Sequence, residues 1–138
     1  MSKRDIYHYQ AKNALKKDGW LVTDDPLIAS LGEEDYRIDL GAEKIIIATK
    51  ENKRIAVEVK SFLSNSVIND FHKALGQILD YKVVLEENNC DRELFMAITE
   101  DTHKSFLKYL LIKLSLKRHN IKLLVFDPQK EEVIKWIN

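Results

Sequence analysis

The sequence predicts an α/β domain in which helices flank a mixed central sheet. Three features predict this class. Residues 55–60 alternate two sets of side chains with the period of two that is typical of a strand. Residues 66–88 repeat apolar side chains every three or four positions, as an amphipathic helix does. Strand-like and helix-like segments also alternate along the chain, which favours a sheet sandwiched between helices.

Composition limits the number of domains and the classes of partner. A chain of 138 residues is expected to form one domain over residues 1–138, and 45% hydrophobic with 32% charged residues is typical of a soluble globular protein. Because 22 basic residues balance 22 acidic ones, any nucleic-acid contact needs a local patch. The only cysteine, Cys90, permits neither an internal disulfide nor a zinc–cysteine cluster. With no signal-like or membrane-length apolar run, we expect a cytoplasmic protein that contacts no membrane.

The first predicted element is an amphipathic helix over residues 4–18, ended by Gly19. Its polar side carries five basic residues, Lys3, Arg4, Lys12, Lys16 and Lys17. His8 lies about one position off the apolar stripe. It can therefore face solvent or a neighbouring strand, and for an isolated histidine the surface or the edge of the core is the simpler interpretation.

The next segments lead into the strand over 55–60. We expect a short strand over 20–22, a turn at 24–26, a loop with a short helical turn over 27–35, and strand segments over 36–41 and 45–48. A turn at 50–53 then closes a hairpin. Asp39 would stand at the start of this hairpin and Glu58 on the returning strand, so that two acidic side chains could converge on one cation.

The second half predicts alternating strands and helices. The expected elements are a strand over 94–98, a helix over about 102–118, and strands over 121–126 and 133–137. The helix is expected to bury Phe106, Leu107, Leu110, Leu111 and Leu114. Six basic residues follow Asp101 without an acidic one among them: Lys104, Lys108, Lys113, Lys117, Arg118 and Lys122. Such a run is usually a solvated face, but it is also the best candidate here for a phosphate-backbone contact.

Glu58 and Lys60 project from the same face of the predicted strand, about 7 Å apart at the backbone for a rise of roughly 3.3 Å per residue. One interpretation is an exposed ion pair on a sheet edge, worth about 0.2 to 1 kcal/mol. The other is half of a metal-dependent phosphodiesterase site. In that site Glu58 binds a divalent cation, and Lys60 stabilises charge on phosphate or orients the attacking water.

Three further polar residues allow both a structural and a functional interpretation. Asp39 stands in a strand pattern, where aspartate is disfavoured, and is either a turn former ahead of Gly41 or a site residue. Gln77 and Tyr81 lie four apart and share a helix face, which is either a solvated flank or part of a site. Gly76 costs helix stability and indicates a close approach to another backbone.

Asp39, the Glu58–Lys60 pair and Gln77 with Tyr81 together resemble the PD-(D/E)XK nuclease superfamily. Ile38 stands where the family name has proline. The resemblance implies a restriction-endonuclease-like core that uses Mg²⁺ or Mn²⁺. The helix pattern of Gln77 and Tyr81 is similar to the Gln-xxx-Tyr motif of RecB-like and lambda-exonuclease-like members.

A position on the first helix extends this resemblance. Many related resolvases carry a metal-binding Glu eleven residues before the glycine that ends the first helix, and here that position is His8. The resemblance therefore implies His8, Asp39 and Glu58 as metal ligands. Magnesium prefers oxygen ligands, so a histidine departs from the usual set.

A closer resemblance covers nearly the whole chain. The segments DIYHYQAKNALKKDGW, IDLGAEK, RIAVEVKSF, ALGQILDY, DRELFMAIT, LLVFDP and VIKWIN are similar, in order and spacing, to the XisH family of fdxN-element excision controlling factors. That family is linked to programmed DNA rearrangement in cyanobacteria and is commonly accompanied by a small XisI-type partner.

The resemblance implies a divalent-metal-dependent DNA endonuclease acting in excision, expected as a homodimer. Its implied catalytic residues are Asp39, Glu58, Lys60, His8 and Gln77, and its implied substrate-binding residues are Tyr81 and Lys12. The alternative is a nuclease fold without catalysis, which binds DNA or an XisI-type partner and regulates a recombinase. A nucleotide-dependent enzyme is not supported, because none of the four glycines forms a phosphate-cradling loop.

Overall fold

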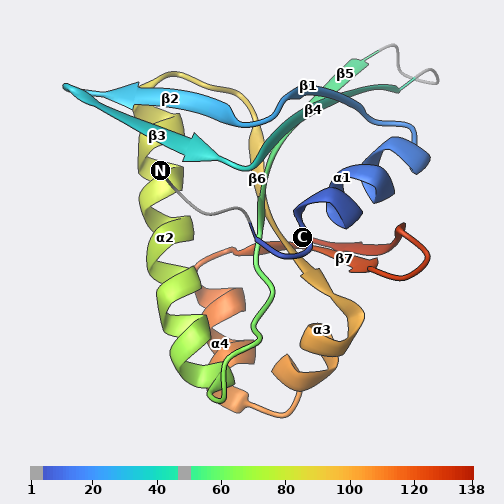
Figure 1. Cartoon of the computed structure of the whole chain (residues 1–138). Helices are drawn as coiled ribbons and strands as arrows, with labels where there is room; N and C mark the ends of the chain where they lie inside the picture. Colours follow the sequence, from blue (N-terminus) through green and yellow to red (C-terminus); the bar gives the residue numbers. More distant parts are fainter. Residues whose placement is uncertain (1–4, 47–50) are drawn as a thin grey trace.

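The computed structural model describes residues 5–46 and 51–138 (Figure 1). Its helices are α1 (His8–Lys17), α2 (Val67–Glu87), α3 (Glu100–Phe106) and α4 (Leu110–Arg118). Its strands are β1 (Leu21–Asp24), β2 (Leu27–Leu31), β3 (Glu34–Ile38), β4 (Leu40–Ile46), β5 (Glu51–Val59), β6 (Glu93–Thr99), β7 (Lys122–Asp127) and β8 (Glu132–Ile137). None of the helices in these ranges has the length and apolar character needed to cross a membrane.

Six strands form one mixed sheet in the order β1-β4-β5-β6-β7-β8. Strands β5, β6 and β7 are parallel neighbours, and the outer pairs on both sides are antiparallel. Parallel neighbours require crossover connections, and α2 supplies the one from β5 to β6 while α3 and α4 supply the one from β6 to β7. The predicted mixed α/β class is confirmed.

Helices cover both faces of this sheet, as predicted, with α1 on one side and α2 on the other (Figure 1). Successive side chains of a strand point to opposite faces, so each central strand contributes to both cores. In β6, Phe95 and Ala97 pack in the cluster with α1, whereas Met96 and Ile98 pack in the cluster with α2. Alternate side chains of the central strands thus pack into two different buried layers, one on each face of the sheet.

The ends of the helices follow from local chemistry. Gly19 has φ +90 after α1, which fits the predicted helix end. The side chain of Ser66 accepts a hydrogen bond from the amide of Asn69 at the start of α2, and Thr99 accepts one from Thr102 at the start of α3. The prediction for Gly76 was wrong, because an added Cβ there would meet no atom within 4 Å.

The prediction of a loop over 27–35 was also wrong. These residues belong to the β2–β3 hairpin, a separate two-stranded sheet in which Ala29 pairs with Tyr36. Charged residues on its second strand hide the alternation that signals a strand. The hairpin packs against the carboxyl-terminal half of α2, where Asn88 donates a hydrogen bond to the carbonyl of Ser30.

The predicted helix over 102–118 is two helices, α3 and α4, joined at residues 107–109. The break changes the phase of the second half, so that Ile112 faces the core. Phe106 is buried as predicted, but the four leucines expected inside are exposed: Leu107, Leu110, Leu111 and Leu114. The turn predicted at 50–53 was wrong for residues 51–53, which begin β5 and pair with β4. Residues 47–48 of the strand predicted over 45–48, residue 50, and the basic residues Lys3 and Arg4 lie outside the described residues.

Candidate functional site

Asp39 and Glu58 meet where β3, β4 and β5 come together. Asp39 lies between β3 and β4, and Glu58 is one residue before the end of β5. The amide of Asp39 donates to Oε1 of Glu58 over 3.2 Å, and the amide of Val59 donates to Oδ2 of Asp39 over 2.7 Å. The structure thus brings the two acidic residues together from adjacent strands. The Asp39 side chain bonds across to the next strand, rather than to a local turn.

Both carboxyl groups are held in an environment that disfavours their charge. Glu58 is only 5% exposed. Burial, with the nearby charge of Asp39, raises the pKa of Glu58 to about 7. Burial also raises the pKa of Asp39, although the Val59 amide and the charge of His8 oppose the effect. Two adjacent acids of this kind form a site where a bound cation would relieve electrostatic cost.

Lys60 supplies a positive charge beside this pair, with Nζ 3.3 Å from Oε2 of Glu58. Strand β5 lies between β4 and β6, so the pair does not sit on a sheet edge. Glu58 is also buried. The interpretation of Glu58 and Lys60 as an exposed edge ion pair is therefore wrong.

His8 is buried on the inner side of α1, with 1% exposure. Its Nε2 lies 2.8 Å from Oδ1 of Asp25, and its Nδ1 lies 3.9 Å from Oδ1 of Asp39. Nδ1 has no hydrogen-bond partner within the described part of the chain. A buried, unpaired ring nitrogen that faces an acid is unusual, because burial without a partner carries a free-energy penalty.

Asp25 was not predicted as a site residue and was treated as part of a turn. It connects two predicted residues, since its Oδ2 also accepts a 2.6 Å hydrogen bond from Nζ of Lys12. Burial alone would raise the pKa of Asp25, but the hydrogen bonds and charges of Lys12 and His8 outweigh burial and lower it. His8 and Lys12 lie four apart on one helix, and this spacing was the available signal that they share a partner.

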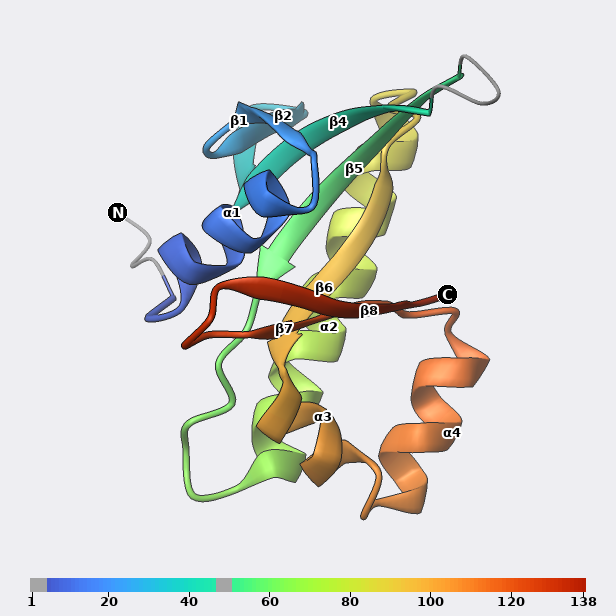
Figure 2. The ribbon, with the colours of Figure 1, turned by 90° about the vertical axis from the view of Figure 1, so that its right-hand side faces the viewer.

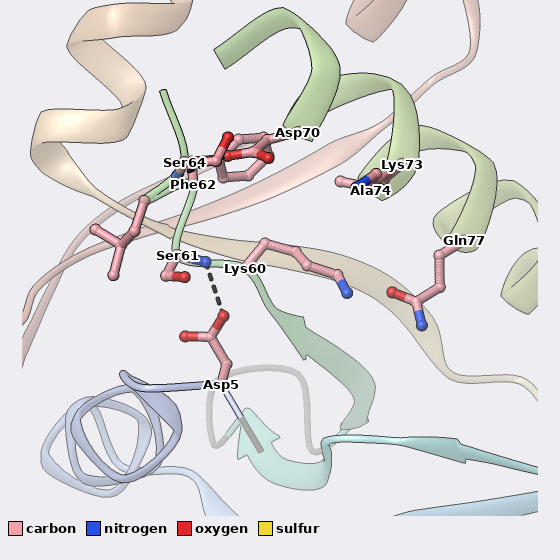
Figure 3. A pocket seen from close by; sticks show the side chains of 10 residues that line it. Asp5, Lys60, Ser61, Phe62, Ser64, Asp70, Lys73, Ala74 and Gln77 are labelled. Atoms are coloured by element: carbon pink, nitrogen blue, oxygen red, sulfur yellow. Dashed lines mark hydrogen bonds between the residues drawn. The ribbon is translucent and has the colours of Figure 1, made fainter. Parts of the chain in front are cut away.

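A cleft of about 550 Å³ opens beside Lys60 (Figure 3). The side chains of Lys60 and Gln77 point into it, and Lys73 lines it from the preceding turn of α2 (Figure 3). Asp5 closes another side, where its Oδ2 accepts a 2.9 Å hydrogen bond from the amide of Ser61. Lys60 thus joins the cleft to the acidic pair. Lys73 was missed, although its spacing of four from Gln77 signals a shared face.

Gln77 and Tyr81 lie on the face of α2 that meets the sheet. Nε2 of Gln77 donates to the Tyr81 hydroxyl over 2.9 Å, and that hydroxyl donates to the carbonyl of Arg37 over 3.1 Å. Burial and the charge of Glu58 raise the pKa of Tyr81 to about 12, so the hydroxyl keeps its proton. Tyr81 is buried and Gln77 is half-buried. The pair therefore fixes the segment before Asp39 instead of forming a solvated flank.

The donor set can be compared with what a divalent cation requires. Within residues 5–46 and 51–138, no three or more His, Cys, Asp and Glu side chains form a ready-made metal-binding group. His8, Asp39 and Glu58 are close in pairs without forming such a group. Magnesium often uses one or two carboxylates and several waters, so the acidic pair and the unpaired Nδ1 of His8 fit a partly hydrated ion.

Fold and site together define a mixed α/β protein with a buried acidic pair beside a lysine-lined cleft. Residues 1–134 match the family model described as XisH protein. The chain belongs to the XisH family, as the sequence resemblance predicted.

Two solved structures are similar over almost the whole chain. One is an XisH family protein from Nostoc punctiforme PCC 73102, with 38% identity, a TM-score of 0.86, and coverage of 97% of this chain and 100% of that one. The other is an fdxN element excision controlling factor protein from Anabaena variabilis, with 40% identity, a TM-score of 0.86, and coverage of 98% and 100%. A search of curated proteins gives no significant match.

Proposed function

We propose that this protein is a divalent-metal-dependent DNA endonuclease acting in the excision of a DNA element. The observation that carries the proposal is the buried Asp39–Glu58 pair, with raised pKa values, next to Lys60 and an open cleft. The description of the Anabaena variabilis protein as an excision controlling factor supports the biological setting. A restriction-endonuclease-like core, a homodimer and a cytoplasmic location complete the proposal.

Mg²⁺ or Mn²⁺ would be held by Asp39 and Glu58, with Nδ1 of His8 as a third donor. Such an ion lowers the pKa of bound water and neutralises charge on a phosphodiester. Hydrogen bonds from the amides of Asp39 and Val59 hold the two carboxylates in place. Asp25 contacts Nε2 of His8 over 2.8 Å and so holds the ring with Nδ1 on the side of Asp39, where a neutral His8 would offer Nδ1 to the ion.

Cationic side chains would act on the DNA backbone. Lys60 would stabilise charge on the phosphate or orient the attacking water; its contact with Glu58 and its position in the lining of the cleft support this role. Lys73 would contact a neighbouring phosphate from the same cleft. Gln77 and Tyr81 position the Asp39 segment. Lys12 would contact the substrate only if its ammonium group separates from the carboxylate of Asp25.

A plasmid-nicking assay in Mn²⁺ tests this function. The wild type and Glu58→Ala are compared with Glu87→Ala, which removes an exposed carboxylate at the end of α2. We expect Glu58→Ala to lower the nicking rate at least a hundredfold and Glu87→Ala to leave it unchanged. Equal nicking by the wild type and Glu58→Ala would contradict the proposal.

A second candidate is a nuclease fold that has kept binding without catalysis. It would assemble with DNA, an XisI-type partner or a recombinase, and regulate excision. Two observations favour it: histidine occupies the position of the expected glutamate, and the net charge of the chain is zero. The two candidates differ in one property, since an endonuclease must bind the cation at the acidic pair and a binding subunit need not.

A further inference from the structure

Four leucines are exposed on α4 and on the segment that joins it to α3. Leu107, Leu110, Leu111 and Leu114 are 53%, 65%, 53% and 53% exposed, and together we call them the leucine face. In α4 the buried Ile112 and the half-buried Leu116 pack into the core. Leu110 and Leu114 are each two positions from Ile112, about 200° around a helix of 3.6 residues per turn, and so point away from the core. Figure 2 shows α4 at the margin of the molecule.

Exposed basic residues accompany the leucine face in the same segment of the chain. Lys104, Lys108, Lys113, Lys117 and Arg118 are all exposed. The sequence has no acidic residue between Asp101 and Asp127, although Lys104 pairs with Glu100 across one turn at 3.4 Å. Lys113 and Lys117 each follow a leucine of the face by three positions and therefore lie beside it. We call these five basic residues the cationic rim.

We propose that the leucine face is a docking site for a partner protein that presents an acidic amphipathic helix. Apolar side chains of such a helix would cover the leucines, and its flanking carboxylates would pair with the cationic rim. A cluster of large apolar side chains this exposed is characteristic of an interaction surface. None of these residues lines the cleft or contacts the acidic pair, so the inference is independent of the proposed nuclease function.

Charge and chemistry favour this occupant over two others. A second copy of the chain would place one cationic rim against an identical rim, and like charges at an interface are unfavourable. DNA would satisfy the lysines but not the leucines at the centre, because DNA-binding surfaces are polar and contact mainly phosphate and sugar. An acidic helix is complementary to both parts.

The probe is a synthetic helical peptide of about 16 residues, with leucines at positions i, i+3, i+4 and i+7 and glutamates on both flanks. One control peptide has the same composition in scrambled order, and the other carries lysine in place of glutamate. Binding is measured by fluorescence anisotropy at low and high salt. We expect the wild type to bind the first peptide at least tenfold more tightly than either control, and high salt to weaken binding.

Two protein variants separate the centre from the rim. Leu110→Ser with Leu114→Ser, and Lys113→Glu with Lys117→Glu, are each expected to weaken peptide binding at least tenfold. Leu21→Ser is the matched control, because Leu21 is 68% exposed on β1, outside the leucine face. Circular dichroism verifies that each variant is folded. If the double leucine variant does not fold, the double lysine variant decides the test.

Three results would overturn the proposal. The first is equal binding of the acidic peptide by the wild type and the folded variants. The second is a dimer, detected by sedimentation, that disappears in the leucine variant, since the occupant would then be a second copy. The third is no peptide binding together with duplex DNA binding that is lost in the lysine variant and kept in the leucine variant, which would make the surface a phosphate contact.

Discussion

The amide of Asp39 donates a hydrogen bond to the carboxylate of Glu58 over 3.2 Å, while the amide that follows Glu58 donates to the carboxylate of Asp39 over 2.7 Å. This reciprocal arrangement keeps two acids side by side in a largely buried position. Their mutual repulsion and burial make the site unfavourable for stability. Such a cost is characteristic of functional sites, where binding of a charged ligand offsets it.

Glu58 is expected to make folding less favourable as pH rises. The folded protein holds the Glu58 proton up to a pKa of about 7, whereas the ordinary value is 4.5. Between these values the folded state binds more protons than the unfolded state, so the free energy of unfolding falls as pH increases. We expect Glu58→Gln to be more stable than the wild type by about 1 to 3 kcal/mol at pH 8 and nearly equal at pH 4. Urea unfolding at both pH values measures this difference, and Glu87→Gln is the control. A difference independent of pH would show that the Glu58 carboxyl does not titrate as described.

Asp25 is expected to act in the opposite direction and at lower pH. Its pKa in the folded protein lies below the ordinary value of 3.8, so its ion pairs stabilise the protein above pH 3.8 and lose this effect as pH falls through the folded pKa. Asp25→Asn should lower the free energy of unfolding at pH 7 by about 1 to 3 kcal/mol. The deficit should shrink at pH 3. Chemical unfolding at the two pH values measures it, and an equal deficit at both would show that the charge of Asp25 is not the cause.

His8 is expected to set which cation binds. Because Nε2 is engaged with Asp25, Nδ1 is the nitrogen that a neutral His8 would offer to the ion, and nitrogen ligands favour Mn²⁺ over Mg²⁺ more than oxygen ligands do. We expect the wild type to bind Mn²⁺ more tightly than Mg²⁺, and His8→Gln, with a hard oxygen donor, to reduce that preference severalfold. Competition titrations with the two ions measure the ratio. A ratio unaltered by His8→Gln would remove His8 from the ligand set.

Sequence periodicity predicted the parts of the site that depend on local structure. Alternation along β5 predicted the strand. The hairpin predicted from the neighbouring segments placed Asp39 next to Glu58. The contact between His8 and Asp25 was missed, because it joins residues 17 apart through the packing of α1 on β1. A contact that depends on tertiary packing cannot be predicted from local sequence patterns.

The exposed leucines show a second limit. Leu110, Leu111 and Leu114 have the spacing of a buried helix stripe, and only the break between α3 and α4 directs Ile112 inward in their place. Periodicity identifies the apolar face of a helix, but it does not show whether another element packs on that face. The hairpin β2–β3 was missed because its second strand carries charged residues where a buried strand would carry apolar ones.

Calorimetric titration of Mn²⁺ into the wild type and Glu58→Gln tests the central claim most directly. If Asp39 and Glu58 form a cation site, the wild type binds one ion per chain and releases protons at pH 6.5, because Glu58 must ionise to bind. Glu58→Gln should then bind at least tenfold more weakly and release fewer protons, while Glu87→Gln should match the wild type. The same affinity and proton release in the wild type and Glu58→Gln would contradict the account.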